Sequence, residues 1–277
     1  NNYRINNKNL SILEIQKNDE IPILVDIDLN KDFIDGCEKR NLYTIKDVNI
    51  LVNIFQMVLK KIIKNLNEDD LCCFLFEKEP YVSEKNNNKI IKNGFHIQFP
   101  KIFLSKKEQE LILYPMVKSE LLNNICNITQ NAIDDGIVRG KGTPWFLYGS
   151  GKGKKYQPYQ LTKGFNKHGD IIDNFCSLLL DYPINDSYVH TTEYVTRHLP
   201  EIFSIDIHEK DDFLYTVKNE YVIEKEVITK PKKTNYIHSS EDDELIDQLL
   251  DLLPPEYCME YSKWIYIGWI LYNIYKN

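Results

Sequence analysis

The alternation of apolar and polar residues in the first hundred positions predicts strands separated by one long helix. Residues 22–29 (PILVDIDL), 71–77 (LCCFLFE) and 94–100 (GFHIQFP) are short apolar runs, the last ending at a proline, and such runs are typical of strands. Between the first two, apolar residues recur at helical spacing over residues 44–65, which begin at a threonine cap. The Asn-rich residues 84–89 are predicted to form a loop.

The following hundred residues predict one further helix and then more strands. A Ser-x-x-Glu capping box at residues 105–108 begins the helix, and Pro115 is expected to kink it. Residues 144–150 and 156–162 read as strands around a turn rich in glycine and lysine, and residues 187–195 as another strand. The order of elements mixes α/β with α+β character.

The last third of the chain predicts a connector followed by a small helical module. Residues 209–240 are charged and weakly patterned, which favours a connector, and a domain boundary is expected near residues 235–240. Two helical stretches separated by a Pro-Pro pair follow. We therefore predict a core over residues 1–235 and a helical module over residues 241–277. Because the chain begins with Asn and stops inside a helical pattern, we expect it to be part of a longer polypeptide.

Composition places the protein among folded soluble domains. Of 277 residues, 43% are hydrophobic and 27% charged, as in ordinary globular proteins. No apolar stretch approaches the roughly 20 residues that span a bilayer, and no signal-like segment opens the chain. Six cysteines form no CxxC pair and lie mostly within apolar runs, which predicts a reducing compartment. We expect a soluble, intracellular protein with no membrane partner.

Positive charge is concentrated locally although the net charge is -7. Residues 139–167 hold seven Lys and Arg and no acid, and residues 85–101 hold four Lys and no acid. Such stretches either bind nucleic acid or nucleotide, or are solvated loops.

Two acids interrupt the first predicted strand. Asp26 and Asp28 stand two positions apart, so they share one face of the strand. Carboxylate oxygens suit Mg²⁺ or Mn²⁺, and a two-metal site would use them for nucleotidyl transfer. The alternative is an edge strand that shows two solvated acids.

A histidine interrupts the third predicted strand. His96 follows Gly94 and Lys92. An imidazole and a lysine can contact triphosphate oxygens, and a glycine leaves room for close approach of a nucleotide. A structural histidine within the strand is the alternative reading.

Two later segments carry further candidates. In AIDDGIV, Asp134 could complete a carboxylate triad, with the adjacent Asp135 as its competitor, while a turn or helix cap explains either residue equally well. The segment WFLYGSGKGKKYQPYQLT interleaves aromatic residues with lysines, which suits nucleic acid or nucleotide, or else the tip of a cationic hairpin. It lacks the glycine spacing and the Ser or Thr of a P-loop.

Taken in order, ILVDIDL, KNGFHIQFP, AIDDGIV and WFLYGSGK with the following PYQLT resemble the archaeo-eukaryotic primase (AEP) superfamily, and most closely the primase-helicases of nucleo-cytoplasmic large DNA viruses such as African swine fever virus. The last helical stretch is similar to the small module that follows the primase core in such proteins. The resemblance implies a two-lobed fold with mixed and antiparallel sheets flanked by helices.

The resemblance also assigns roles to residues. It implies that Asp26, Asp28 and Asp134 are catalytic acids that bind Mg²⁺ or Mn²⁺. The implied nucleotide contacts are His96, Gly94, Lys92, Ser150 and Lys152, and the implied DNA contacts are Lys141, Lys154, Lys155 and Tyr156. An arginine expected among the phosphate contacts has only Arg139 and Arg197 as candidates.

The implied activity is DNA primase and polymerase: template-directed nucleotidyl transfer from NTPs or dNTPs onto primers. The implied partners are a single-stranded DNA template and a helicase domain in the same full-length polypeptide, and the implied location is the cytoplasmic site of viral replication.

Two rival functions remain open from the sequence. ILVDIDLN also resembles the opening motif of haloacid-dehalogenase-type phosphatases, and Lys167, Gly169, Asp170 and Asp173 resemble their later acidic motif, although Asn30 departs from the pattern. A non-catalytic nucleic-acid-binding module would keep the basic stretches and make Asp26 and Asp28 incidental.

Overall fold

The computed structural model describes most of the chain up to residue 221 and part of the remainder. The described residues are 11–34, 40–85, 88–124, 126–140, 142–151, 158–184, 187–188, 191–205, 211–221 and 240–253, together with Ile267 and Leu271. The chain divides into two compact units, residues 1–222 and residues 223–277.

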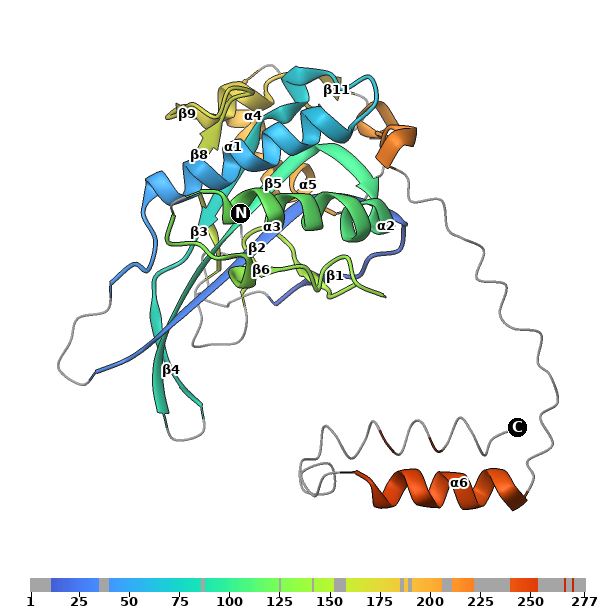
Figure 1. Cartoon of the computed structure of the whole chain (residues 1–277). Coiled ribbons are helices and arrows are strands. Elements are labelled where there is room, and N and C mark those ends of the chain that lie inside the picture. Colours follow the sequence, from blue (N-terminus) through green and yellow to red (C-terminus); the bar gives the residue numbers. More distant parts are fainter. Residues whose placement is uncertain are drawn as a thin grey trace. The chain divides into compact units, whose positions relative to one another are not determined.

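A seven-stranded antiparallel sheet forms the centre of the first unit (Figure 1). Its strands run in the order β6 (Ile133–Asp134), β2 (Glu20–Asp32), β5 (Asn88–Ser105), β3 (Cys73–Glu77), β8 (Gln160–Phe165) and β9 (Ile171–Ile172), and β4 (Tyr81–Lys85) pairs with the outer part of β5. Two-stranded pairs join β1 (Leu13–Glu14) to β7 (Trp145–Phe146), and β10 (Pro183–Ile184) to β11 (Ser187–Tyr188). These antiparallel pairs confirm the α+β class.

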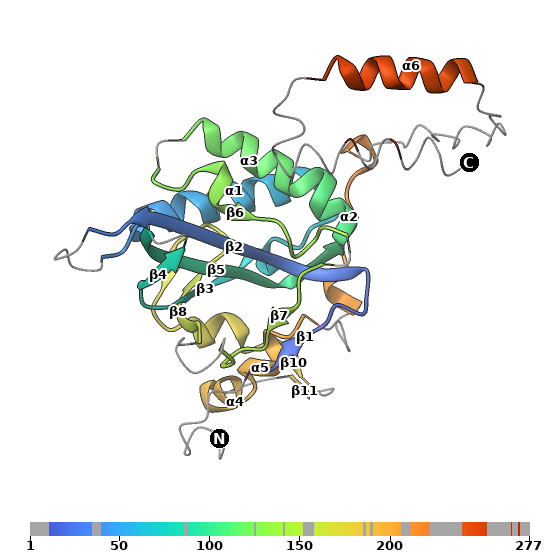
Figure 2. The same ribbon diagram turned by 90° about the horizontal axis from the view of Figure 1, so that it is seen from below.

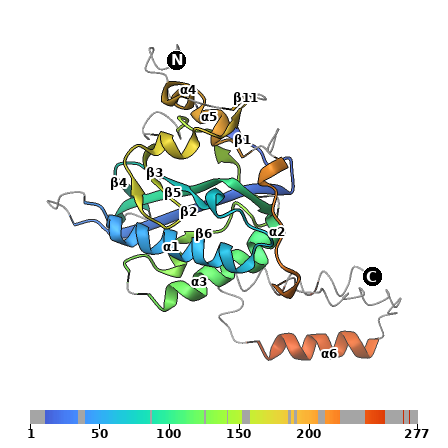
Figure 3. The same ribbon diagram turned by 90° about the horizontal axis from the view of Figure 1, so that it is seen from above.

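Two helical segments cover one face of this sheet (Figures 2 and 3). They are α1 (Ile45–Ile62) and the segment made of α2 (Lys106–Glu108), the π-turn η2 (Gln109–Leu113) and α3 (Tyr114–Leu122). Helix α1 buries an apolar stripe, and its Phe55 ring lies 6.1 Å from the ring of Phe99 on β5 and 6.2 Å from that of Tyr114. Burial of such aromatic residues dominates the stability of a core of this kind.

A second apolar cluster covers part of the opposite face. Here Phe74 and Phe76 of β3 pack with η4 (Phe175–Leu179), α4 (Thr192–Arg197) and α5 (Leu199–Ile202). Because side chains alternate along β3, its Cys73 and Leu75 belong instead to the helix-covered core. The remaining part of this face, over β2 and the middle of β5, carries the polar residues of the candidate site.

Short 3₁₀ turns complete the first unit. They are η1 (Glu68–Leu71), η3 (Gln130–Ala132), η5 (Asp211–Phe213) and η6 (Asn219–Tyr221).

The strands and helix predicted over residues 22–29, 44–65 and 71–77 are confirmed, as β2, α1 and β3. Two other predictions for the first hundred residues are wrong. Strand β5 does not end at Pro100. Its register with β2 shifts there, because Pro22 faces Phe103 while Ile23 faces Phe99. Pro100 therefore lies in the irregular part of the ladder, where its missing N–H removes no ladder hydrogen bond. The predicted loop over residues 84–89 is also largely strand, because β4 runs to residue 85 and β5 begins at residue 88.

Three predictions for residues 105–195 need correction. The expected kink at Pro115 is replaced by the π-turn η2 just before it, since Pro115 lies in the first turn of α3. Of the strand predicted over residues 187–195, only Ser187 and Tyr188 pair as strand, because Thr191 caps helix α4 by accepting a hydrogen bond from the Tyr194 N–H. Only Trp145 and Phe146 of the strand predicted over residues 144–150 pair as strand.

The predicted connector is in part a packed segment. Phe213 and Val217 are buried, and Val217 forms a bridge with Ile63 after α1. The sequence did not predict this packing, because irregular segments bury apolar residues without a regular spacing. Residues 222–239, including the expected boundary near 235, lie outside the described residues.

The second unit contains helix α6 (Ser240–Asp251), which confirms a helix after the connector. The predicted Pro-Pro break and most of the following stretch lie outside the described residues. None of the helices in the described part of the chain is both long and apolar enough to cross a membrane.

Candidate functional site

The register of the sheet aligns four residues from four strands in one row. Asp26 of β2 faces Asp134 of β6 on one side and His96 of β5 on the other, and His96 in turn faces Phe76 of β3. Directly paired residues point to the same face of a sheet. The row therefore brings two acids and an imidazole together from three separate segments, of which those of Asp26 and Asp134 are more than a hundred residues apart.

Asp26 and His96 form the closest pair of this row. His96 Nε2 lies 3.3 Å from Asp26 Oδ1, and the two side chains are only 13% and 27% exposed. Burial raises the pKa of Asp26, but the positive charge and the contact of His96 outweigh burial and hold that pKa below its ordinary value. Oδ1 is itself buried, and no described residue makes a hydrogen bond of good geometry to it. The carboxylate thus retains a lone pair for another ligand.

Asp28 lies one pleat further along β2, on the same face. Loss of hydration raises its pKa, and the charges of Asp26 and Asp134 raise it further, while Lys78 and Lys92 oppose the shift. The three acids therefore repel one another at this end of the sheet, and two lysines only partly compensate them.

Gly94 faces Asp28 across the β2–β5 ladder. A Cβ built at this position would lie 2.2 Å from the Ile27 carbonyl oxygen and 3.4 Å from Asp28 Oδ1. No larger residue fits there without movement of the backbone. The close approach of the β2 backbone therefore requires a glycine at this position, while its role beside a nucleotide stays a prediction.

The acids of β2 and the histidine of β5 line one pocket of about 380 Å³. Its walls include Asp26, Asp28, Asp134, His96, Lys92 and Ser150, all of which the sequence singled out, together with Lys78, Tyr81, Thr143, Trp145 and Tyr159. A pocket of this size, apolar in part and with convergent charges, is typical of a small-molecule site.

Aromatic rings hold the imidazole in place. His96 stacks on Tyr159 with 3.6 Å between ring centroids, and its centroid lies 4.4 Å from that of Trp145. Trp145 and Tyr159, two aromatic residues of the lysine-rich segment, thus pack on the site histidine. In the same segment, Tyr148 packs on Phe76 and Phe203 in the second apolar cluster, and Tyr156 lies outside the described residues.

The structure separates the two adjacent acids of the AIDDGIV segment. Asp134 lines the pocket, and its Oδ1 accepts a hydrogen bond from the Gly136 N–H at 2.8 Å. Asp135 instead forms ion pairs of 2.8 Å with Lys118 of α3 and with Arg139, which hold its pKa below the ordinary value although burial opposes them. The residue that shares the face of Asp26 is therefore Asp134, while its catalytic role stays a prediction.

Several predicted contacts cannot be placed. Lys152 and the four proposed DNA-binding residues, Lys141, Lys154, Lys155 and Tyr156, lie outside the described residues. The two arginine candidates are placed elsewhere, since Arg139 pairs with Asp135 and Arg197 with Glu193 on α4. Neither belongs to the pocket lining.

Sequence reasoning missed Lys78 and Tyr81. Lys78 directly follows β3 in the charged stretch EKEP, which carries no motif and no periodicity. Only the antiparallel path of β3, β4 and β5 turns this stretch toward the acids. No signal in the sequence identifies it.

The donor set of the pocket fits a hard cation. Asp26 and Asp28 offer carboxylate oxygens, one of them without a hydrogen-bond partner in the described structure, and their mutual repulsion is what a cation relieves. Within the described residues, no group of three or more His, Cys, Asp or Glu side chains is arranged to enclose a metal ion by itself. The pair therefore fits an ion that takes further ligands from water and phosphate, as Mg²⁺ does in nucleotide sites.

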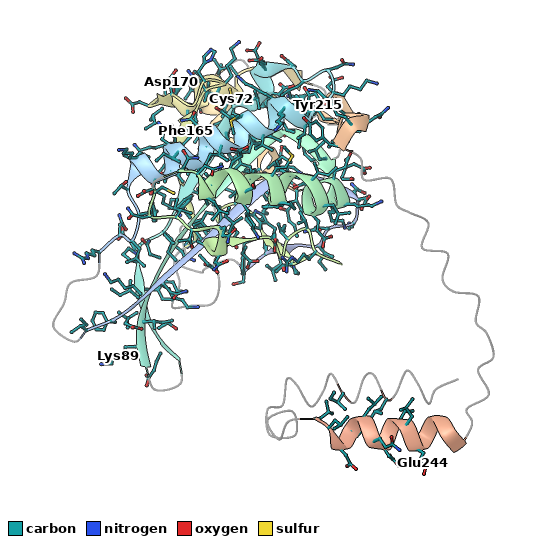
Figure 4. All side chains as sticks on the ribbon, in the orientation of Figure 1. Cys72, Lys89, Phe165, Asp170, Tyr215 and Glu244 are labelled. Atoms are coloured by element: carbon teal, nitrogen blue, oxygen red, sulfur yellow. The ribbon has the colours of Figure 1, made fainter. Side chains whose placement is uncertain are left out.

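The later acidic motif of the rival phosphatase lies at the other end of the sheet. Asp170 lies beside β9, far from Lys89 near the tip of the β4–β5 hairpin (Figure 4), and accepts a hydrogen bond from Asn166 of the same turn. Lys167 pairs with Asp69. These residues do not line the pocket, so Asp26 lacks the partners that a phosphatase of this class requires.

An antiparallel sheet that presents paired acids and a strand histidine to one pocket agrees with the resemblance to the AEP superfamily. The chain belongs to the family described as "C962R protein N-terminal AEP domain", whose model matches residues 1–165. The resemblance seen in the sequence is thereby confirmed.

Three viral proteins are similar to the chain. It is 27% identical over 289 residues to "Putative helicase 121R" of Invertebrate iridescent virus 3, covering 94% of this chain and 29% of that protein. It is 25% identical over 297 residues to "Putative helicase 184R" of Invertebrate iridescent virus 6, covering 97% and 30%. It is 25% identical over 195 residues to "Putative primase C962R" of African swine fever virus (isolate Warthog/Namibia/Wart80/1980), covering 67% and 19%. The chain thus spans about three tenths of the length of the first two relatives.

Proposed function

We propose that the chain is a DNA primase-polymerase domain that transfers nucleotides from NTPs or dNTPs to a growing primer. One observation carries the proposal: Asp26, Asp28, Asp134 and His96 line one pocket on one face of the sheet. Membership of the AEP family supports this reaction class.

The pocket offers a path for a triphosphate along β5. Lys92 and His96 both line the pocket from β5, on either side of Gly94. Because strand residues rise about 3.3 Å each, the two side chains are roughly 13 Å apart along the strand, which leaves room for a chain of phosphates. Ser150, which is buried in the pocket wall, supplies a further hydroxyl.

Asp26 and Asp28 hold the divalent cation in this proposal, and Asp134 completes the acidic set. Mg²⁺ or Mn²⁺ bound there supplies Lewis-acid activation of the primer 3′-hydroxyl and neutralises phosphate charge. The 3′-oxygen then forms a bond to the α-phosphorus, the bond from the α-phosphorus to the bridging oxygen breaks, pyrophosphate leaves, and the hydroxyl proton passes to water. The acids orient the reactants throughout.

His96 has two roles in this proposal. Its Nε2 holds Asp26, as the 3.3 Å separation indicates, and its position in the pocket wall lets the imidazole donate to a phosphate when a nucleotide is bound. We retain it as a nucleotide-contacting residue, rather than as a base.

The names of the relatives support a wider assignment. Two are named as helicases and one as a primase, and the chain covers only a fraction of each. We propose that a helicase domain lies in the same full-length polypeptide, that single-stranded DNA is the template, and that the protein acts at cytoplasmic sites of viral replication.

The test is primer synthesis and extension on single-stranded DNA with Mg²⁺ or Mn²⁺. Asp26→Asn and Asp28→Asn should each reduce incorporation at least a hundredfold while DNA affinity, which lysines supply, changes little. Asp32→Asn is the matched control, because Asp32 lies on the same strand, is exposed and does not line the pocket. Full activity in the two acid variants would refute the assignment of the site.

The rival functions give different results in the same assay. DNA binding without incorporation in the unmodified protein identifies a non-catalytic module. Metal-dependent release of phosphate from small phosphoesters identifies a phosphatase. Either result overturns the proposed function.

A further inference from the structure

Lys78 is the pocket cation to which neither the sequence motifs nor the family resemblance gave a role. It follows β3 at the start of the connection to β4, is half-buried and lines the same pocket as the three acids. Lys92, the other lysine of the lining, comes from β5. The two lysines thus reach the pocket from different strands.

Tyr159 fixes the position of Lys78. The Lys78 Nζ lies 4.1 Å from the centre of the Tyr159 ring and 5.6 Å from that of Tyr81. The imidazole of His96 covers one face of Tyr159 at 3.6 Å, so the ammonium occupies the other face. A cation on an aromatic face is held electrostatically, with restricted motion of the side chain.

Four side chains consequently form a column along the pocket wall, in the order Lys78, Tyr159, His96 and Trp145. They come from four segments: the β3–β4 connection, the residue before β8, β5 and β7. Both faces of Tyr159 are occupied within this column. Tyr159 is therefore not available as a surface on which a base can stack.

The charge of Lys78 acts on both acids of β2. Its ammonium lies in the wall of the pocket that Asp26 and Asp28 also line. Lys78 is thus a counter-charge for the acid pair in the free protein. Once a divalent cation neutralises these acids, the Lys78 ammonium can pair with the phosphates of a bound nucleotide.

We propose that Lys78 is a binding residue for the triphosphate of the incoming nucleotide, and that Tyr159 is a positioning residue that holds its ammonium in the pocket. The inference rests on the proposed function. It supplies the cation that Arg139 and Arg197 do not, since both arginines are paired outside the pocket.

Binding of a non-hydrolysable nucleoside triphosphate, measured by calorimetry with Mg²⁺, tests Lys78 without relying on turnover. Lys78→Ala and Lys78→Met should each raise Kd about 10- to 100-fold, the effect of losing one charged hydrogen bond to phosphate. The methionine variant keeps the length of the side chain and its packing on Tyr159. The control is Lys46→Ala, on the exposed first turn of α1, which should bind like the unmodified protein.

Variants of Tyr159 test the positioning role. Tyr159→Phe keeps the aromatic face and should retain nucleotide affinity within about threefold, whereas Tyr159→Leu should weaken it about tenfold. In the Lys78→Ala background, Tyr159→Leu should weaken binding less than it does alone, because the contact with Lys78 is already lost and only the stacking on His96 remains. Additive losses in the double variant would show that Tyr159 acts independently of Lys78.

The outcomes separate this inference from the function on which it rests. If the unmodified protein incorporates nucleotides and both Lys78 variants bind nucleotide normally, the role of Lys78 is refuted and the proposed function stands. If the unmodified protein binds nucleotide through Lys78 but never incorporates it, the binding role stands and the proposed transferase function fails. Thermal unfolding of each variant identifies a loss of affinity that is due to misfolding. If Lys78→Ala misfolds, the affinity of Lys78→Met decides whether Lys78 binds the nucleotide.

Discussion

Asp26 and His96 face each other across the β2–β5 ladder, with His96 Nε2 3.3 Å from Asp26 Oδ1. A buried carboxylate beside an imidazole is stabilised in its charged form, and the imidazole is in turn held between Trp145 and Tyr159. The histidine therefore links the aromatic wall of the pocket to its acidic floor.

His96→Phe tests which property of this histidine matters. Phenylalanine keeps a ring between Tyr159 and Trp145 but removes the nitrogen that faces Asp26. We expect incorporation to fall at least tenfold and the free energy of unfolding to fall by about 1–3 kcal/mol, because a buried charge loses its partner. Primer extension and urea denaturation measure the two effects. Normal activity in this variant would mean that His96 serves only as a packing residue.

Gly94→Ala tests the requirement for glycine between Lys92 and His96 on β5. The added Cβ meets the Ile27 carbonyl oxygen at 2.2 Å, so the strand must move, and we expect a loss of about 1–3 kcal/mol in unfolding free energy together with weaker nucleotide binding. Gly140→Ala is the comparison: that glycine has a φ of +57° but nothing within 4 Å of a Cβ, so only backbone strain of about 1–2 kcal/mol applies. Equal nucleotide affinity in the two variants would contradict the role assigned to Gly94.

Substitution of Asp134 should affect activity, whereas substitution of Asp135 should affect stability. Asp134→Asn should lower incorporation at least tenfold with little change in stability, because its side chain faces the pocket. Asp135→Asn should leave incorporation within about threefold but reduce stability by about 1–2 kcal/mol, since it breaks the ion pairs with Lys118 and Arg139. Primer extension and thermal unfolding of both variants decide, and the opposite pattern would exchange the two roles.

Asp47 should make the fold sensitive to acid. Its buried carboxylate accepts hydrogen bonds from the N–H and hydroxyl of Thr44 and from the N–H and amide of Asn127. These bonds outweigh burial and lower its pKa from 3.8 to about 2. A depressed pKa stabilises the folded state above the unfolded-state value, so this stability is lost as the pH falls from about 4 to about 2.

The expected size of the Asp47 effect is about 2 kcal/mol at neutral pH. Urea denaturation between pH 2 and pH 6 measures it. Asp47→Asn should be less stable than the unmodified protein at pH 6 and should show a flatter dependence on pH in the acid range. An unchanged slope in the variant would show that other carboxylates cause the acid sensitivity.

Local patterns in the sequence determined several elements and most of the candidate site. The helical spacing after Thr44 gave α1, because a helix with one buried face needs apolar residues at that period. The two-residue spacing of Asp26 and Asp28, and the Lys-x-Gly-x-His order of residues 92–96, placed these side chains correctly because alternation along a strand is fixed by its own geometry. These features depend only on neighbours in the chain.

Only the tertiary structure decided which distant residues meet. The pairing of β2 with β6 brought Asp134 rather than Asp135 to the face of Asp26, and a shift of one residue would have exchanged them. The bulge between Pro22 and Ile23 let β5 continue past Pro100. Lys78 reached the acids through the path of β3 and β4. Such outcomes depend on strand register and on contacts between segments far apart in the chain, and neither leaves a periodic signal in the sequence.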